Sequence, residues 1–144
     1  YGIVRVYLAS PSGPASSDDV TAVETVLDNS YAPDCVTRIV EAAEAVPFPI
    51  TSTVTVDAAP GLTTGIIQAA ILERLTAFFS GAQDGDIQIG GYDGTLTVAR
   101  IRAEIVKAHP RIYNVSLTSP LLNAAIADNE LPTLSTVTTT VVFT

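Results

Sequence analysis

The chain has 144 residues, 47% of them apolar, and its 15 acidic and 7 basic residues give a formal net charge of −8. This length is typical of one domain, and the apolar content excludes an intrinsically disordered chain. The negative charge argues against nucleic acid and anionic membranes as partners, because binding to phosphates requires a basic face.

The ends of the chain and its single cysteine give further expectations. The chain begins at Tyr1 and contains no methionine, so we expect a fragment or a processed product. No apolar run approaches the ~18–20 residues that cross a bilayer, and no basic segment precedes an apolar stretch as in a signal peptide. The lone Cys35 excludes an internal disulfide framework and fits a reducing compartment.

A strand and a helix are expected first. Residues 3–8 alternate in a β-branched and aromatic pattern with one fully apolar face, which predicts a strand. A loop rich in serine, proline and glycine follows. Ser16 and Asp19 have the spacing of a capping box, and apolar residues then recur at helical intervals. We therefore predict a helix over about residues 17–28.

Two strands are expected in the middle of the chain. Residues 36–45 begin with β-branched side chains and lack a helix cap, which favours a strand. Pro47 and Pro49 are expected to interrupt the chain. Residues 50–56 then alternate threonine with apolar side chains, so we predict a strand whose threonines face solvent.

Two further helices are expected after a turn. A stripe of large apolar residues predicts a helix that ends near Ser80 and anchors the core, because burying each such side chain is worth ~1.5–3 kcal/mol. Thr97 is expected to cap a third helix, which Pro110 ends. The apolar stripes are Ile67, Ala70, Ile71, Leu75 and Phe78 in the first and Val98, Ile101 and Ile105 in the second, with Arg100, Glu104 and Lys107 outside.

The last elements complete the fold class. We expect a strand over 112–118, one helical turn over 121–126 and a threonine- and valine-rich strand over 134–143. Together the elements predict an α+β fold with a mostly antiparallel sheet covered by about three helices, in the order β-α-β-β-α-α-β-β.

The sequence is compatible with two domain organisations. The chain is either a single α+β region over residues 1–144 or two small subdomains, 1–57 and 58–144. In either case the first strand, helix and strand are expected to form a right-handed crossover unit.

Two residues with reactive side chains stand alone in the sequence. His109 falls at the expected end of the third helix, where a cation favours the helix dipole, and it has no triad partner at a readable spacing. Cys35 lacks a second cysteine and a neighbouring histidine, so a small buried side chain is favoured over a nucleophile. We predict no catalytic residue.

Acidic and glycine-rich segments are the candidates for metal and phosphate sites. Asp84, Asp86 and Asp93 lie in one glycine-rich segment, but no glutamate closes it as a calcium loop requires, so turns are favoured. Residues 61–65 precede a helix but lack the lysine of a phosphate-binding loop. We predict no metal or cofactor site.

Four segments of the chain resemble the C-terminal region of baseplate J-like proteins. They are GIVRVYL at residues 2–8, the proline-rich PFPI step at 47–50, RIRAEI at 100–105 and IYNVSLTSP at 112–120. The resemblance lies in element order and local character, and it runs over nearly the whole chain.

This resemblance implies a structural role in a contractile tail. Members of the family are wedge components of the baseplate, where several copies surround a central hub and take part in the rearrangement that triggers sheath contraction. The implied location is the virion tail, after synthesis in the bacterial cytoplasm. The implied partners are other baseplate wedge and hub proteins and copies of itself within a ring, through a surface such as the edge of the strand at 134–143.

Two other functions remain as alternatives. A ferredoxin-like ligand-binding or regulatory module would need a concave pocket with a few convergent polar groups. An enzyme would need acid and base residues that meet in a cleft, and the sequence offers no such cluster.

Overall fold

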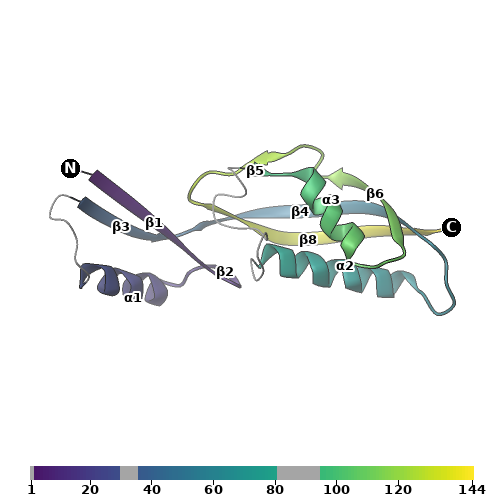
Figure 1. Ribbon diagram of the computed structural model, residues 1–144, viewed down its shortest axis with the longest axis horizontal. Helices are drawn as coiled ribbons and strands as arrows, with labels where there is room; N and C mark the ends of the chain where they lie inside the picture. The colour runs from purple at the N-terminus through teal and green to yellow at the C-terminus, as the bar shows by residue number, and fades with distance from the viewer. Residues whose placement is uncertain (1, 30–35, 81–94) are drawn as a thin grey trace.

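The computed structural model describes residues 2–29, 36–80 and 95–144. Within these ranges the chain forms three helices and eight strands. The long elements follow the predicted order, and three two-residue strands are added to them (Figure 1). Their bounds are β1 (Gly2–Ser10), β2 (Gly13–Pro14), α1 (Ser17–Asp28), β3 (Val36–Ala42), β4 (Glu44–Val56), α2 (Thr64–Phe79), β5 (Thr95–Leu96), α3 (Val98–Lys107), β6 (Ile112–Ser119), β7 (Ala124–Ala125) and β8 (Glu130–Phe143).

The α+β class is confirmed, but the sheets are mixed. β1 pairs with β3 in parallel, and β4 pairs with β8 in parallel over most of both strands. The pairs β1–β2, β4–β6 and β5–β7 are antiparallel. The expectation of a mostly antiparallel sheet is wrong, because parallel neighbours need long crossovers and the chain provides them. α1 connects β1 to β3, and α2, α3 and β6 lie between β4 and β8.

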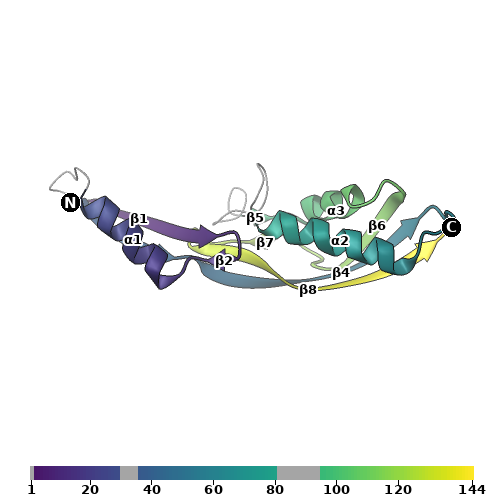
Figure 2. The ribbon, with the colours of Figure 1, turned by 90° about the horizontal axis from the view of Figure 1, so that it is seen from below.

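Two layered units lie end to end along the long axis of the molecule (Figure 1). The first is the sheet β2-β1-β3 with α1, and the second is the sheet β6-β4-β8 with α2 and α3. Only Ala43 separates β3 from β4, so one strand leads almost directly into the other. In the second unit both helices lie on the same side of the sheet, and the described elements leave its opposite face uncovered (Figure 2).

The hydrophobic core belongs to the second unit. Its helices supply the predicted stripes: Ile67, Ile71, Leu75 and Phe78 from α2 and Ile101 and Ile105 from α3 are buried. The inward residues of β4, β6 and β8 complete the layer beneath them. In the first unit α1 begins at the predicted capping box of Ser16 and Asp19 but buries no residue completely.

We expect residues 44–144 to fold without the first unit. Among the described residues, the first unit contributes only Val40 to the buried apolar set, whereas the second unit has a continuous core that also includes Ala43 at the junction. A fragment that keeps such a core should retain cooperative unfolding. Circular dichroism during heating of this fragment and of the whole chain measures this. A fragment without a cooperative transition would show that the two units fold only together.

Two local predictions are wrong for identifiable reasons. β4 continues through Pro47 and Pro49 as one strand, with a register shift against β8 between Phe48 and Ile50. Over these residues β8 is its only partner among the described strands, and its pairing with β6 begins at Thr51. A proline is tolerated where one edge of a strand has no ladder partner. The helical turn predicted over 121–126 is replaced by β7, which pairs with β5.

The start of α3 is capped from a distant segment. The side-chain Oδ1 of Asn123 accepts a hydrogen bond from the Val98 N–H at 2.9 Å. The predicted cap, Thr97, holds the N-cap position but makes no side-chain cap bond. Asn123 therefore ties the segment between β6 and β7 to the helix, which explains why this segment does not form its own helical turn.

A buried pair of hydroxyl groups joins β4 to β8. Ser52 Oγ and Thr139 Oγ1 lie 3.2 Å apart inside the core layer. We expect Ser52→Ala or Thr139→Val each to lower the free energy of unfolding by about 1 kcal/mol, because each leaves a buried hydroxyl without its partner. The double variant should cost less than the sum of the two. Urea unfolding of all four proteins measures this coupling, and strictly additive costs would contradict it.

Candidate docking surface

The predicted site residues do not converge on a reaction centre within the described ranges. Cys35, Asp84, Asp86 and Asp93 lie outside the described residues. His109 follows α3, and its Nδ1 accepts a hydrogen bond from the Arg111 N–H at 3.2 Å, which is a local structural contact.

The described part of the chain also contains neither a group of metal ligands nor a membrane-spanning helix. There, no group of three or more histidine, cysteine, aspartate or glutamate side chains could hold a metal ion. The helices in these ranges are also too short or too polar to cross a bilayer. In the segment weighed as a phosphate loop, Gly61 has a φ of 79°, which suits a turn before α2. The prediction that the chain has no catalytic, metal or cofactor site remains a prediction.

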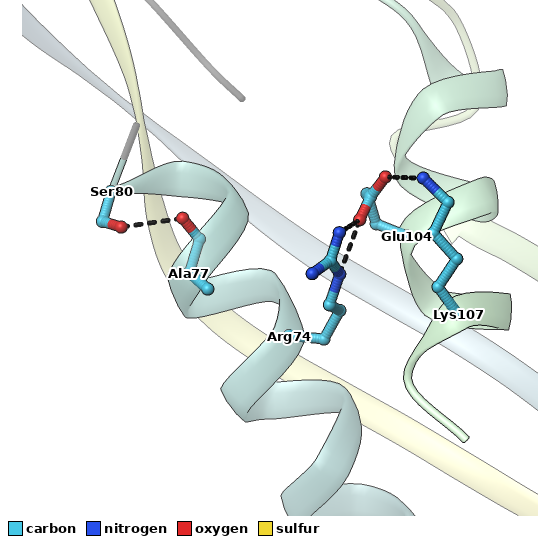
Figure 3. A network of polar contacts seen from close by, with 5 residues as sticks. All are labelled: Arg74, Ala77, Ser80, Glu104 and Lys107. Atoms are coloured by element: carbon cyan, nitrogen blue, oxygen red, sulfur yellow. Dashed lines mark hydrogen bonds and ion pairs between the residues drawn. The ribbon is translucent and has the colours of Figure 1, made fainter. Parts of the chain in front are cut away.

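One charged residue that was expected to face solvent is buried. Glu104 has a side chain only 7% exposed, and it lies between α2 and α3 (Figure 3). Lys107 Nζ donates to its Oε1 at 2.7 Å, and Arg74 Nε donates to its Oε2 at 2.7 Å. The terminal Arg74 nitrogen also forms an ion pair with Oε2. The outward placement of Glu104 is wrong because α3 turns this position toward α2.

The charge of Glu104 is set by this environment. Burial by itself would raise the pKa of Glu104, but the hydrogen bonds from Lys107 and Arg74 and their positive charges outweigh it. The pKa of Glu104 is therefore below its usual value, and the carboxylate stays ionised at neutral pH. Its bonds are internal to the helix pair, so the cluster joins α2 to α3.

One surface with free binding capacity is the outer edge of β8. The order of the described sheet is β6-β4-β8, so among the described strands β8 has a neighbour on one side only, as does β6. The Thr144 N–H donates to Val56 O at 3.1 Å, and the Ala58 N–H donates to Thr144 O at 3.1 Å. Residues of a parallel strand direct their backbone groups to alternate sides. The backbone N–H and C=O of Thr144 point toward β4. The backbone groups of residues 143, 141, 139 and 137 therefore point away from β4.

A groove runs between this strand edge and α2. It includes a hollow of about 320 Å³ lined by Gln68, Ala69, Leu72, Val137, Thr138 and Thr139. Leu72 is 50% exposed although it is a large apolar residue. A second hollow of about 210 Å³ lies further along α2 and β8, and residues 11–13 of the first unit line it together with Thr76 and Leu134. We call the hollow between Gln68 and Thr139 and the strand edge beside it the α2/β8 groove.

One carbonyl of the outer edge is already bonded. Gln68 Nε2 donates to Thr139 O at 2.8 Å, which agrees with the outward direction of this backbone group. A side-chain amide from α2 thus occupies the place that the N–H of a further strand would take.

Other apolar residues are exposed away from this groove. Leu121 and Leu122 are 72% and 80% exposed in the segment that Asn123 ties to α3. On the uncovered sheet face, Thr53 lies between Thr140 of β8 and Ser116 of β6. Isolated exposed apolar residues are normal on protein surfaces, so these carry less weight than a free strand edge.

The described structure defines a class of protein: a small α+β scaffold with a long open strand edge beside a helix. Residues 50–140 match the family model described as the Baseplate J-like protein C-terminal domain. This match covers well over half of the chain, and the chain belongs to that family. The recognition made from the sequence is confirmed for this range. No curated protein matches the chain.

The family sets the general role. Its members are structural components of phage tail baseplates, and this chain is such a component. The matched range begins within β4 and ends within β8, and it therefore contains α2, α3 and the α2/β8 groove.

Proposed function

We propose that this chain is a wedge subunit of the baseplate of a contractile tail. It acts by binding other proteins, and it carries out no reaction of its own. The observation that carries this proposal is the family match over residues 50–140.

The arrangement of polar groups supports an assembly role. In the described ranges, every buried side-chain nitrogen or oxygen has a hydrogen-bond partner. Glu104 is the most buried ionisable group among the described residues. Both of its carboxylate oxygens accept hydrogen bonds from Arg74 and Lys107, so it is not available as a general acid or base. Catalytic groups, in contrast, need an accessible cleft and a perturbed pKa that suits proton transfer.

The proposed partners are other wedge and hub proteins of the baseplate and further copies of this chain within a ring. The proposed location is the tail of the virion, after synthesis in the bacterial cytoplasm. Nucleic acid and membranes are not among the proposed partners, because the net charge of −8 opposes their phosphates.

Purified contractile particles test this proposal. We expect the full polypeptide that contains this chain to co-purify with sheath, hub and wedge proteins, and cryo-electron microscopy should place it in the baseplate. Deletion of its gene should yield particles without a complete baseplate. Recovery of the polypeptide only as a free protein, with normal particles in its absence, would contradict the proposal.

The alternative of a ferredoxin-like ligand-binding or regulatory module has no specific support in the described residues. The hollows found there are open surface depressions. The hollow beside Arg74 and Lys107, about 370 Å³, lies next to side chains already bonded to Glu104.

A further inference from the structure

We propose that the α2/β8 groove binds one extended, uncharged segment of a partner protein, which adds to the sheet as a fourth strand beside β8. This inference rests on the proposed function and names the kind of contact that the subunit makes. The order of the sheet would become β6-β4-β8-partner.

The backbone of β8 requires a partner of this shape. From Val137 to Phe143 the odd-numbered residues direct their N–H and C=O groups away from β4, and the register with β4 has no shift in this range. Only an extended backbone offers donors and acceptors at the same spacing. A helix placed in the groove would leave these groups unpaired.

From residue 137 onward the edge of β8 lacks the protection that exposed edges usually have, whereas the first part of the strand contains Pro132 and ends in a register shift. Natural edge strands are guarded by charged side chains, prolines or bulges, because a bare edge pairs with other chains. Residues 137–143 of β8 read VTTTVVF, with neither a charge nor a proline. Among the described residues, Gln68 bonds to one carbonyl of this edge, that of Thr139. An unprotected strand edge of this length indicates that a strand of a partner covers it in the assembled state.

The wall of the groove defines the side chains that the partner presents. Ala69 is small and Leu72 is 50% exposed, so the hollow of about 320 Å³ has room for an apolar side chain against Leu72. Side chains of a strand alternate between its two faces. Every second residue of the bound segment therefore points toward α2, and those residues should be apolar.

Charge determines the remaining chemistry of the partner. The chain has a net charge of −8, yet the described lining of the α2/β8 groove contains no ionisable side chain. A charged residue of the partner would be desolvated there without an opposite charge, which is costly. A second copy of this chain would bring a further net charge of −8, and the uncharged lining of this groove offers no ion pair to offset that repulsion. We therefore assign the groove to an uncharged segment of a different protein.

The experiment uses a fluorescent peptide of about ten residues that alternates valine and threonine, the length of an ordinary strand. An uncharged polyethylene glycol tail keeps the peptide soluble. A second peptide has the same sequence with N-methyl groups on alternate residues, which removes the donors needed for strand pairing. Fluorescence anisotropy measures binding to the whole chain, and hydrogen exchange reports the amides of Val137 and Val141.

We expect saturable binding of the first peptide, none of the methylated one, and slower exchange at Val137 and Val141. Leu72→Glu should weaken binding at least about tenfold, because it places a charge against the apolar row of the peptide. Ala69→Glu should do the same from the neighbouring position. Leu122→Glu is the matched control on an exposed leucine outside the groove, and it should leave the affinity unchanged. Circular dichroism checks that each variant is folded.

Several results would overturn the inference. These are failure of the unmethylated peptide to bind, equal binding of both peptides, or equal weakening by Leu72→Glu and Leu122→Glu. Dimerisation of the chain alone in sedimentation, lost in Leu72→Glu, would assign the groove to a second copy instead. If the wild-type polypeptide is part of purified particles but the peptide does not bind, the groove assignment fails while the baseplate role stands.

Discussion

Replacing Phe78 by alanine should lower the free energy of unfolding by about 3–5 kcal/mol. Phe78 is 1% exposed within the core, and its ring and that of Phe79 pack in a T-shaped arrangement at a centroid distance of 5.4 Å. The guanidinium of Arg100 lies 5.7 Å from the same ring. The variant loses the transfer free energy of a large side chain, leaves a cavity, and removes both ring contacts.

This loss is large in relation to the whole stability of a domain, which is typically about 5–15 kcal/mol. Urea unfolding followed by circular dichroism measures it. Leu122→Ala is the control, because Leu122 is highly exposed and surface substitutions usually change stability by less than about 0.5 kcal/mol. A Phe78→Ala variant no less stable than Leu122→Ala would show that α2 does not anchor the core.

The sequence predicts the helices and most long strands well, because the spacing of apolar residues within each segment is enough to identify its secondary structure. α1 matches the predicted residues 17–28, and the stripe from Ile67 to Phe78 is buried as expected. Alternation over residues 50–56 places Val54 and Val56 in the core. In each of these segments the local preference and the tertiary environment favour the same structure.

What the sequence does not predict depends on contacts between distant segments. The pairing of β4 with β8 joins residues far apart in the chain, and no local pattern states whether it is parallel. The burial of Glu104 depends on Arg74 of another helix. The cap of α3 comes from Asn123, which lies 25 residues further along the chain.

The candidate docking surface is likewise predicted from the sequence only in part. A threonine- and valine-rich strand at the end of the chain is predicted from the sequence, and so is the use of its edge for partners. The groove beside it is not, because Ala69 and Leu72 become its wall only when α2 packs along β8. The resemblance to baseplate J-like proteins supplies the general role, whereas the chemistry of the contact comes from the backbone and the charge around it.

The buried carboxylate of Glu104 gives the second large expected effect. Glu104→Gln should lower the free energy of unfolding by about 2 kcal/mol near neutral pH, since two charge-assisted hydrogen bonds are weakened. The cost is below that of breaking a fully buried pair because the side chains of Arg74 and Lys107 are 30% and 61% exposed and regain water.

The pH dependence of this effect follows from the lowered pKa of Glu104. Burial opposes ionisation, but the bonds from Lys107 and Arg74 prevail, so the folded-state pKa lies below the unfolded value. The carboxylate therefore stabilises the fold fully above its unfolded pKa of about 4.3, and this stabilisation is lost as pH falls through the folded pKa. Urea unfolding between about pH 3 and pH 7 should show wild type and Glu104→Gln converging toward the acid end. The exposed Glu24→Gln serves as a control with little effect, and a Glu104→Gln deficit that stays constant with pH would mean that packing, not charge, holds α2 to α3.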